Sequence, residues 1–134
     1  MQQSGLAHLC HHNAHWEYCY SFDERVVYIK AYKPAWEQEA RLKWFAIIPD
    51  VDLPGKGSLE WQAYVTAGQA YVTARRVYGI EWQAYEIARS VTAWQASETA
   101  RQAYVEKFAV ELEVLHTRLF PGCPWNEETM FPQS

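Results

Sequence analysis

The sequence predicts a mainly α-helical fold of the α+β class, in which a short N-terminal β-hairpin and a short helix pack on long heptad-repeat helices. The phrase Trp-Gln-Ala-Tyr and its variants recur through residues 60–108 with a seven-residue spacing, which is typical of helix-on-helix packing. Aromatic and β-branched residues flank a polar turn at residues 22–24, which indicates a hairpin. These patterns favour a coiled coil or a helical hairpin with a small β-element beside it.

The length, charge and cysteine content narrow the class of protein. The chain has 134 residues, which fits one domain. Its net charge of −4 argues against a general nucleic-acid-binding protein, which would be basic. No apolar run approaches a membrane span, and the N-terminus lacks the pattern of a signal peptide. An odd number of cysteines without a secretion signal indicates reduced thiols and a cytoplasmic location.

Proline and helix-cap signals divide the single domain, residues 1–134, into segments. Pro34 suits the first turn of a helix that Pro49 ends. Ser58 is a suitable N-cap for the repeat, and Pro121 ends the last helix. The expected segments are a tail at 1–14, a hairpin at 15–33, a helix at 34–48, repeat helices at 58–89 and 92–119, and an extended tail at 120–134.

Each heptad builds a helix with two apolar faces. At about 100° per residue, Trp61, Tyr64 and Val65 fall on one side, and Ala63 and Ala67 fall nearly opposite. The bulky face can pack on the rest of the chain. Alanines on the other face permit the close approach of a second helix, so we expect self-association into a homo-oligomer.

The repeat loses its frame once. Trp94 follows Trp82 by twelve residues, which rotates it by about 120° around a continuous helix. Thr92 begins a pattern that resembles a capping box, so we expect a kink or a turn near residues 89–92.

One position of the seven-residue repeat, here called the slot, is mostly tryptophan or arginine. Its residues are Trp61, Gly68, Arg75, Trp82 and Arg89. Arginine stems that cover aromatic surface explain this pattern most simply, and cation–π stacking across a helix pair is an alternative. A sharper alternative is a slot for a planar anionic ligand, with Arg75 and Arg76 as its main charge donors. The candidate residues for ligand or partner binding are Trp61, Tyr64, Tyr71, Arg75, Arg76, Trp82, Tyr85, Arg89, Trp94 and Arg101.

The N-terminal segment is rich in possible metal ligands. They are His8, Cys10, His11, His12, His15 and Cys19. Their spacing fits no standard zinc module, so a metal site is a minority hypothesis beside an adventitious His-rich tail. His116, far along the chain, is interpreted as a helix-surface residue or a partly buried contact. We therefore expect no metal and no cofactor.

Catalytic motifs are missing from the sequence. It contains no nucleophile elbow, P-loop, dinucleotide fingerprint or zinc-protease helix. The carboxylates of residues 106–113 are most simply a solvated helix face. We therefore expect no enzyme activity.

The C-terminal half resembles a group of uncharacterised proteins from prokaryotes, metagenomes and their viruses. The matching parts are the repeats at 61–107, Leu115-His116, residues 121–125 and residues 129–132. This chain has Phe120 where the pattern has the first cysteine of a C-x-x-C pair, which argues against a metal or redox role for that pair. The resemblance implies a prokaryotic or viral origin and carries no activity.

The leading functional prediction is a non-enzymatic binding protein that self-associates through its long helices. On the resemblance alone, it would be a viral or mobile-element protein that captures a host protein. The alternatives are an oligomeric protein that binds or sequesters a small anionic, nucleotide-like ligand in Trp/Arg slots, and a purely structural oligomer.

Overall fold

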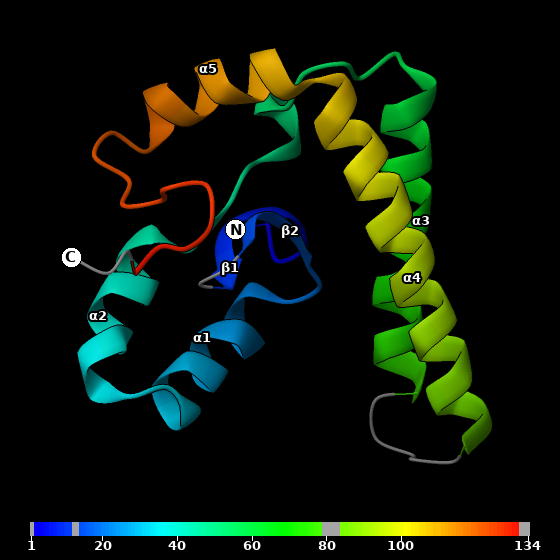
Figure 1. Ribbon diagram of the computed structural model, residues 1–134. Helices are drawn as coiled ribbons and strands as arrows, with labels where there is room; N and C mark the ends of the chain where they lie inside the picture. The colour runs from blue at the N-terminus through cyan, green and yellow to red at the C-terminus, as the bar shows by residue number, and fades with distance from the viewer. Residues whose placement is uncertain (1, 12–13, 79–83, 132–134) are drawn as a thin grey trace.

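Helices make up most of the computed structural model, and a small antiparallel sheet lies at the N-terminal end of the chain (Figure 1). The structure describes residues 2–11, 14–78 and 84–131. The predicted class, mainly helical with a small N-terminal β-element, is confirmed. The elements are β1 (Gly5–His11), β2 (Ala14–Cys19), α1 (Phe22–Tyr32), α2 (Ala35–Trp44), β3 (Ala46–Ile47), the 3₁₀ turn η1 (Asp50–Asp52), α3 (Leu59–Tyr78), α4 (Ala84–Lys107) and α5 (Ala109–Leu119).

The strands form one sheet in the order β2-β1-β3, and both neighbours run antiparallel to β1. In the register with β2, Leu6 lies opposite Tyr18 and His8 lies opposite Trp16. Successive side chains of a strand point to opposite faces, so Leu6 and Ala7 belong to two different cores. Both residues are fully buried, and the rest of the chain therefore has to cover two faces.

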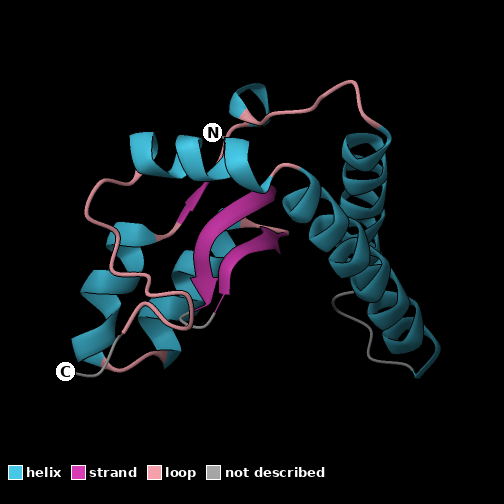
Figure 2. Ribbon diagram, turned by 45° about the horizontal axis from the view of Figure 1, so that its top comes forward, coloured by secondary structure: helices cyan, strands magenta, loops and turns pink. Residues whose placement is uncertain are grey.

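Two clusters of buried side chains fill these faces. The larger cluster consists of Leu6, Trp16, Ile48, Leu53, Tyr64, Tyr104, Leu112 and Leu115, and joins the sheet to α3, α4 and α5. The smaller cluster consists of Ala7, Cys19, Ile29 and Phe45, and joins the sheet to α1 and α2. The ribbon views show the strands enclosed between α5 on one side and α1 and α2 on the other (Figures 1 and 2).

The prediction for the N-terminal segments is wrong in two places. The expected tail at 1–14 contains β1, the central strand of the sheet. In the expected hairpin at 15–33, only residues 15–19 are strand, and residues 22–32 form helix α1. Ser21 caps α1, since the backbone N–H of Glu24 donates a hydrogen bond to Ser21 Oγ at 3.3 Å. Burial of Ile29 in the smaller core outweighs the strand preference of its β-branched neighbours.

The expected helix at 34–48 is correct in its first part only. Helix α2 ends at Trp44, and the chain then extends into β3, whose Ala46 and Ile47 pair with β1. If α2 continued to Pro49, the backbone N–H and C=O groups on this edge of β1 would lack the hydrogen-bond partners that buried groups need. The chain therefore leaves the helix at Trp44 and pairs with β1.

The repeat forms a helical hairpin, because α3 and α4 lie side by side and run in opposite directions (Figures 1 and 2). The predicted break at 89–92 is wrong, since α4 continues without interruption from Ala84 to Lys107. The chain reverses between Tyr78 and Ala84, and residues 79–83 lie outside the described part. Coiled-coil packing of the two helices stays a prediction.

The expected helix at 92–119 is divided at Phe108. Helix α5 begins at Ala109 and turns away from α4 across the top of the sheet (Figure 1). The Phe108 ring lies against Gly55, which has a φ of +75°, and a Cβ there would overlap the ring. This close approach fixes the loop before α3 against the junction of α4 and α5.

The two faces predicted for α3 have different environments. Tyr64 is buried in the larger core, and Trp61 and Val65 pack against it, as predicted for the bulky face. On the small face, Ala63 is exposed and Ala67 is partly buried. A partner for this face stays a prediction. In the part of the chain that the structure describes, no helix combines the length and apolar character that a membrane span needs.

Gly68 allows β2 and α3 to pack closely, and this contact can be tested. A Cβ at Gly68 would overlap the ring of Tyr18, which edge contacts with Tyr64 and Tyr71 hold in place at 5.8 and 6.2 Å between centroids. We expect Gly68→Ala to lower the free energy of unfolding by about 1–3 kcal/mol, although alanine is the better helix former. Urea unfolding measures the change. The control Ala63→Gly, at an exposed position of the same helix, should cost about 1 kcal/mol, and a stabilising Gly68→Ala would contradict the packing.

Candidate functional site

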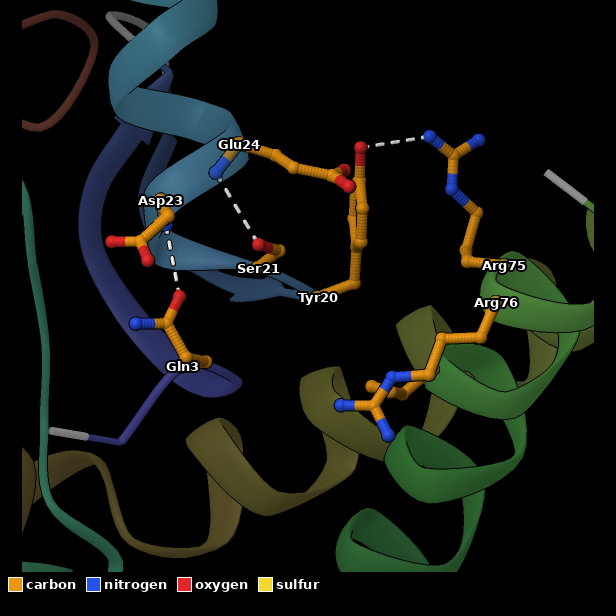
Figure 3. A pocket seen from close by; sticks show the side chains of 8 residues that line it. Gln3, Tyr20, Ser21, Asp23, Glu24, Arg75 and Arg76 are labelled. Carbon is orange, nitrogen blue, oxygen red and sulfur yellow. Dashed lines mark hydrogen bonds between the residues drawn. The ribbon is translucent and has the colours of Figure 1, made fainter. Parts of the chain in front are cut away.

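A hollow of about 520 Å³ lies between the start of α1 and the C-terminal part of α3 (Figure 3). Its polar wall comes from the N-terminus and the junction of β2 with α1, and its basic wall comes from α3. The lining residues are Gln3, Tyr20, Ser21, Asp23, Glu24, Val72, Arg75 and Arg76. Backbone segments far apart in the sequence therefore share one site.

Local hydrogen bonds hold the β2–α1 wall. The backbone N–H of Phe22 donates to the Gln3 carbonyl at 2.7 Å, and that of Asp23 donates to Gln3 Oε1 at 2.9 Å. With Ser21 as cap, these bonds satisfy N–H groups of the first turn of α1. The wall is therefore formed before any ligand binds.

Arg75 is the best-positioned charged group of the hollow. Its Nη2 donates a hydrogen bond to Tyr20 Oη at 2.8 Å, and its guanidinium carbon lies 4.3 Å from the centroid of the same ring. Burial raises the pKa of Tyr20 although the bond from Arg75 lowers it, so the phenol stays neutral. Arg76 is exposed and extends from the next position of α3 (Figure 3). Two guanidinium groups thus border the hollow opposite Asp23 and Glu24.

A second hollow, of about 330 Å³, adjoins the first and shares Tyr20, Glu24 and Arg75 with it. Aromatic rings dominate its lining, which also includes Tyr18, Tyr28, Tyr71, Trp94, Glu17, Cys19 and Arg25. Burial, and after it the charge of the neighbouring Glu98, raises the pKa of Glu17 to about 7, although Arg101 and Arg25 lower it. One site therefore combines flat apolar surfaces, a carboxyl group that changes charge near neutral pH, and a fixed guanidinium.

The structure separates the residues predicted as a binding site into three groups. Arg75, Arg76, Tyr71 and Trp94 line the hollows. Trp61 and Tyr64 belong to the larger core, and Arg101 pairs with Glu98 at 2.8 Å and donates to the Trp16 carbonyl at 3.0 Å. Trp82 and the side chains of Tyr85 and Arg89 lie outside the described part, so the predicted Trp82–arginine slot is untested.

Sequence reasoning missed the β2–α1 side of the hollow. The sequence predicts a hairpin there and indicates no role for Gln3, Tyr20 or Glu24. The segment from Ser21 to Glu24 has the S-x-x-E pattern of a capping box, which was the available signal for a helix start.

The histidines gather in a way that the sequence did not predict. His8 and His15 lie together with His116, and one ligand atom of each falls within 4.8 Å of the others. Cys123 Sγ lies 3.4 Å from His8 Nε2. Cys19 belongs to the smaller core, and the side chains of Cys10 and His11, together with His12, lie outside the described part. Burial lowers the pKa of His8 to about 3 and that of His15 to about 4, so both rings are neutral at pH 7.

Comparison of the chain with protein-family models, curated proteins and solved structures finds no match.

The raised pKa of Glu17 predicts a pH dependence of stability. Its folded-state pKa, about 7, is above the ordinary 4.5, so its ionisation weakens the fold as pH rises through this range. We expect Glu17→Gln to be more stable than the wild type at pH 8, by about 1 kcal/mol after allowance for partial exposure, and the difference to shrink toward pH 5. Urea unfolding at both pH values measures it. The exposed control Glu106→Gln should show no such pH dependence; an equal response of both variants would contradict the assignment.

Proposed function

We propose that this protein is a non-enzymatic binding protein that takes a small, planar, anionic ligand of the nucleotide type in the two hollows beside Arg75. The observation that carries the proposal is the position of Arg75 on the wall that both hollows share, held by the hydrogen bond to Tyr20. A guanidinium fixed in this way can bind an anion without losing its own side-chain freedom at that moment.

The two hollows suit different parts of such a ligand. Arg75 and Arg76 offer several N–H donors, and phosphate oxygens accept them in bidentate pairs. The rings of Tyr71 and Trp94 offer faces on which a base can stack. Glu24, which lines both hollows, can accept a hydrogen bond from a ribose hydroxyl. The volumes lie in the range of small-molecule sites.

Self-association has support from one separate observation, the exposure of Ala63 on the small face of α3. The capture of a host protein rests on the sequence resemblance and stays a prediction. Light scattering at micromolar concentration measures the oligomeric state, and a monomer would contradict self-association.

Binding of ATP and adenosine tests the ligand proposal. We expect calorimetry to detect ATP binding, with adenosine weaker because it lacks the phosphates that pair with the arginines. Arg75→Ala and Arg76→Ala should each weaken ATP binding by about tenfold or more, since a charged hydrogen bond contributes roughly 1.5–3 kcal/mol. Arg118→Ala, an exposed arginine on α5, is the matched control and should bind as the wild type does.

Two results would contradict the proposal. One is that ATP does not bind at millimolar concentration and that the native mass spectrum of the purified protein shows no bound small molecule. The other is equal ATP binding by the wild type, Arg75→Ala and Arg76→Ala, because the hollows would then not hold the ligand.

A further inference from the structure

We propose that His8, His15, His116 and Cys123 bind one Zn²⁺ ion. The four residues come from β1, β2, α5 and the segment after α5, respectively. They are separated by up to 115 positions in the sequence, and the fold brings their side chains to one place. This site lies apart from the hollows beside Arg75, and the proposal does not depend on the proposed function.

The distances match those of a tetrahedral zinc site. His8 Nε2 lies 3.2 Å from His116 Nε2 and 3.4 Å from Cys123 Sγ. With Zn–N bonds of about 2.0–2.1 Å and a Zn–S bond of about 2.3 Å, tetrahedral geometry separates two nitrogens by about 3.3 Å and a nitrogen from a sulfur by about 3.6 Å. One ligand atom of the third histidine, His15, is within 4.8 Å of those of the other two, so small side-chain movements bring the three ring nitrogens to bonding distance of one ion.

A hydrogen bond at the far side of the His8 ring directs the lone pair of its other nitrogen toward His116 and Cys123. His8 Nδ1 lies 2.7 Å from the Trp44 carbonyl oxygen, which can only accept, so Nδ1 carries the proton and Nε2 carries a lone pair. Without a metal, His116 Nε2 can donate a hydrogen bond to this lone pair, which lies 3.2 Å away. Metal binding requires the other tautomer of His116, with the proton on Nδ1, and Glu113 Oε1 faces that nitrogen at 3.7 Å.

His15 supplies an independent observation. Its Nε2 is buried and has no hydrogen-bond partner in the part of the chain that the structure describes. An unsatisfied buried nitrogen typically costs on the order of 1–3 kcal/mol. A metal–nitrogen bond removes this cost, because it replaces the missing hydrogen bond.

The surroundings hold the rings as an outer shell of a metal site would. The Trp44 carbonyl and the Glu113 carboxylate face the Nδ1 atoms of His8 and His116, which is the usual partner arrangement of zinc-bound histidines. Phe120 stacks on His8 with centroids 3.8 Å apart, and Trp125 stacks on His15 at 5.3 Å. These rings fix the orientation of the ligands and shield the centre from water.

Gly122 places the sulfur ligand. Its φ of +80° is a conformation that glycine adopts without strain, and the resulting turn is closed by a hydrogen bond from Cys123 N–H to the Phe120 carbonyl at 3.2 Å. The turn carries Cys123 back toward β1. Phe120, which stands where the resembled pattern has a cysteine, lies against His8 as a stacking ring. Because Phe120 cannot bind a metal, Cys123 is the sulfur ligand of the proposed site, and His8, His15 and His116 are its nitrogen ligands.

The donor set selects the metal and its role. Three imidazole nitrogens and one thiolate suit Zn²⁺, whereas Mg²⁺ and Ca²⁺ require oxygen ligands. Four protein ligands complete a tetrahedron and leave no position for a substrate water, which is the pattern of a structural site. The ion would tie β1, β2 and α5 to a C-terminal segment that contains no helix or strand through residue 131.

The test begins with protein purified without a histidine tag. We expect elemental analysis to find one zinc per chain. After replacement by Co²⁺, we expect visible absorption of tetrahedral intensity and a thiolate-to-cobalt charge-transfer band in the near ultraviolet. Failure to retain zinc and failure to take up stoichiometric Co²⁺ would together overturn the proposal.

Variants assign the ligands. Cys123→Ser should abolish the charge-transfer band, and His116→Ala should lower the affinity for the metal. Glu113→Gln alters only the partner of His116 and should weaken zinc binding by about tenfold. This is the small end of the usual effect of an outer-shell group, because Glu113 is exposed. Cys19→Ala, which removes a thiol of the smaller core, is the matched control and should keep the band. Metal that persists unchanged in Cys123→Ser and His116→Ala would overturn the assignment.

Thiol alkylation of the wild-type protein gives a readout that does not depend on the folding of a variant. Zinc should protect Cys123 from iodoacetamide, and chelation should expose it, as peptide mass mapping would show. Equal alkylation of Cys123 with and without zinc would overturn its role as a ligand.

Discussion

The burial of β1 on both faces is the constraint on which the rest of the structure depends. Leu6 and Ala7 are fully buried on opposite faces of the strand, so neither face is exposed to solvent at these positions. The central strand also has two edges, which β2 and β3 must satisfy with backbone hydrogen bonds. The remaining chain is therefore divided into two layers. Helices α1 and α2 cover one face, and the repeat helices with α5 cover the other.

This division explains the position of the hollows. Tyr18 of β2 packs against Gly68, and the next outward residues of the same regions, Tyr20 and Arg75, meet at the edge of that contact. The repeat slot that holds Trp61, Gly68 and Arg75 follows the side of β2 from the core to the surface. Each residue type in the slot suits its depth: a large ring at the core, no side chain at the closest approach, and a guanidinium at the rim.

The histidine site lies at the opposite end of β2 from the hollows, because His15 is near the start of this strand and Tyr20 follows its end. The described residues of the C-terminal segment form no helix or strand, and its side chains reach the sheet through Cys123 and Trp125. A metal ion would add strong, directional contacts between this segment and the sheet. The same ion would join α5, and through it the end of the repeat, to the two strands that carry His8 and His15.

Local patterns in the sequence determined the features that need only neighbouring residues. The seven-residue period predicted long helices with Trp61 and Tyr64 on the buried side, and Arg75 and Arg76, predicted as charge donors of a Trp/Arg slot, line a hollow. Tertiary structure decided the rest. Residues 22–32 became a helix because Ile29 could be buried in the smaller core, and α4 passed through Thr92 unbroken because it packs along α3. His8 met His116 and Cys123 only because β1 is central, and no local spacing can encode a contact between residues more than a hundred positions apart.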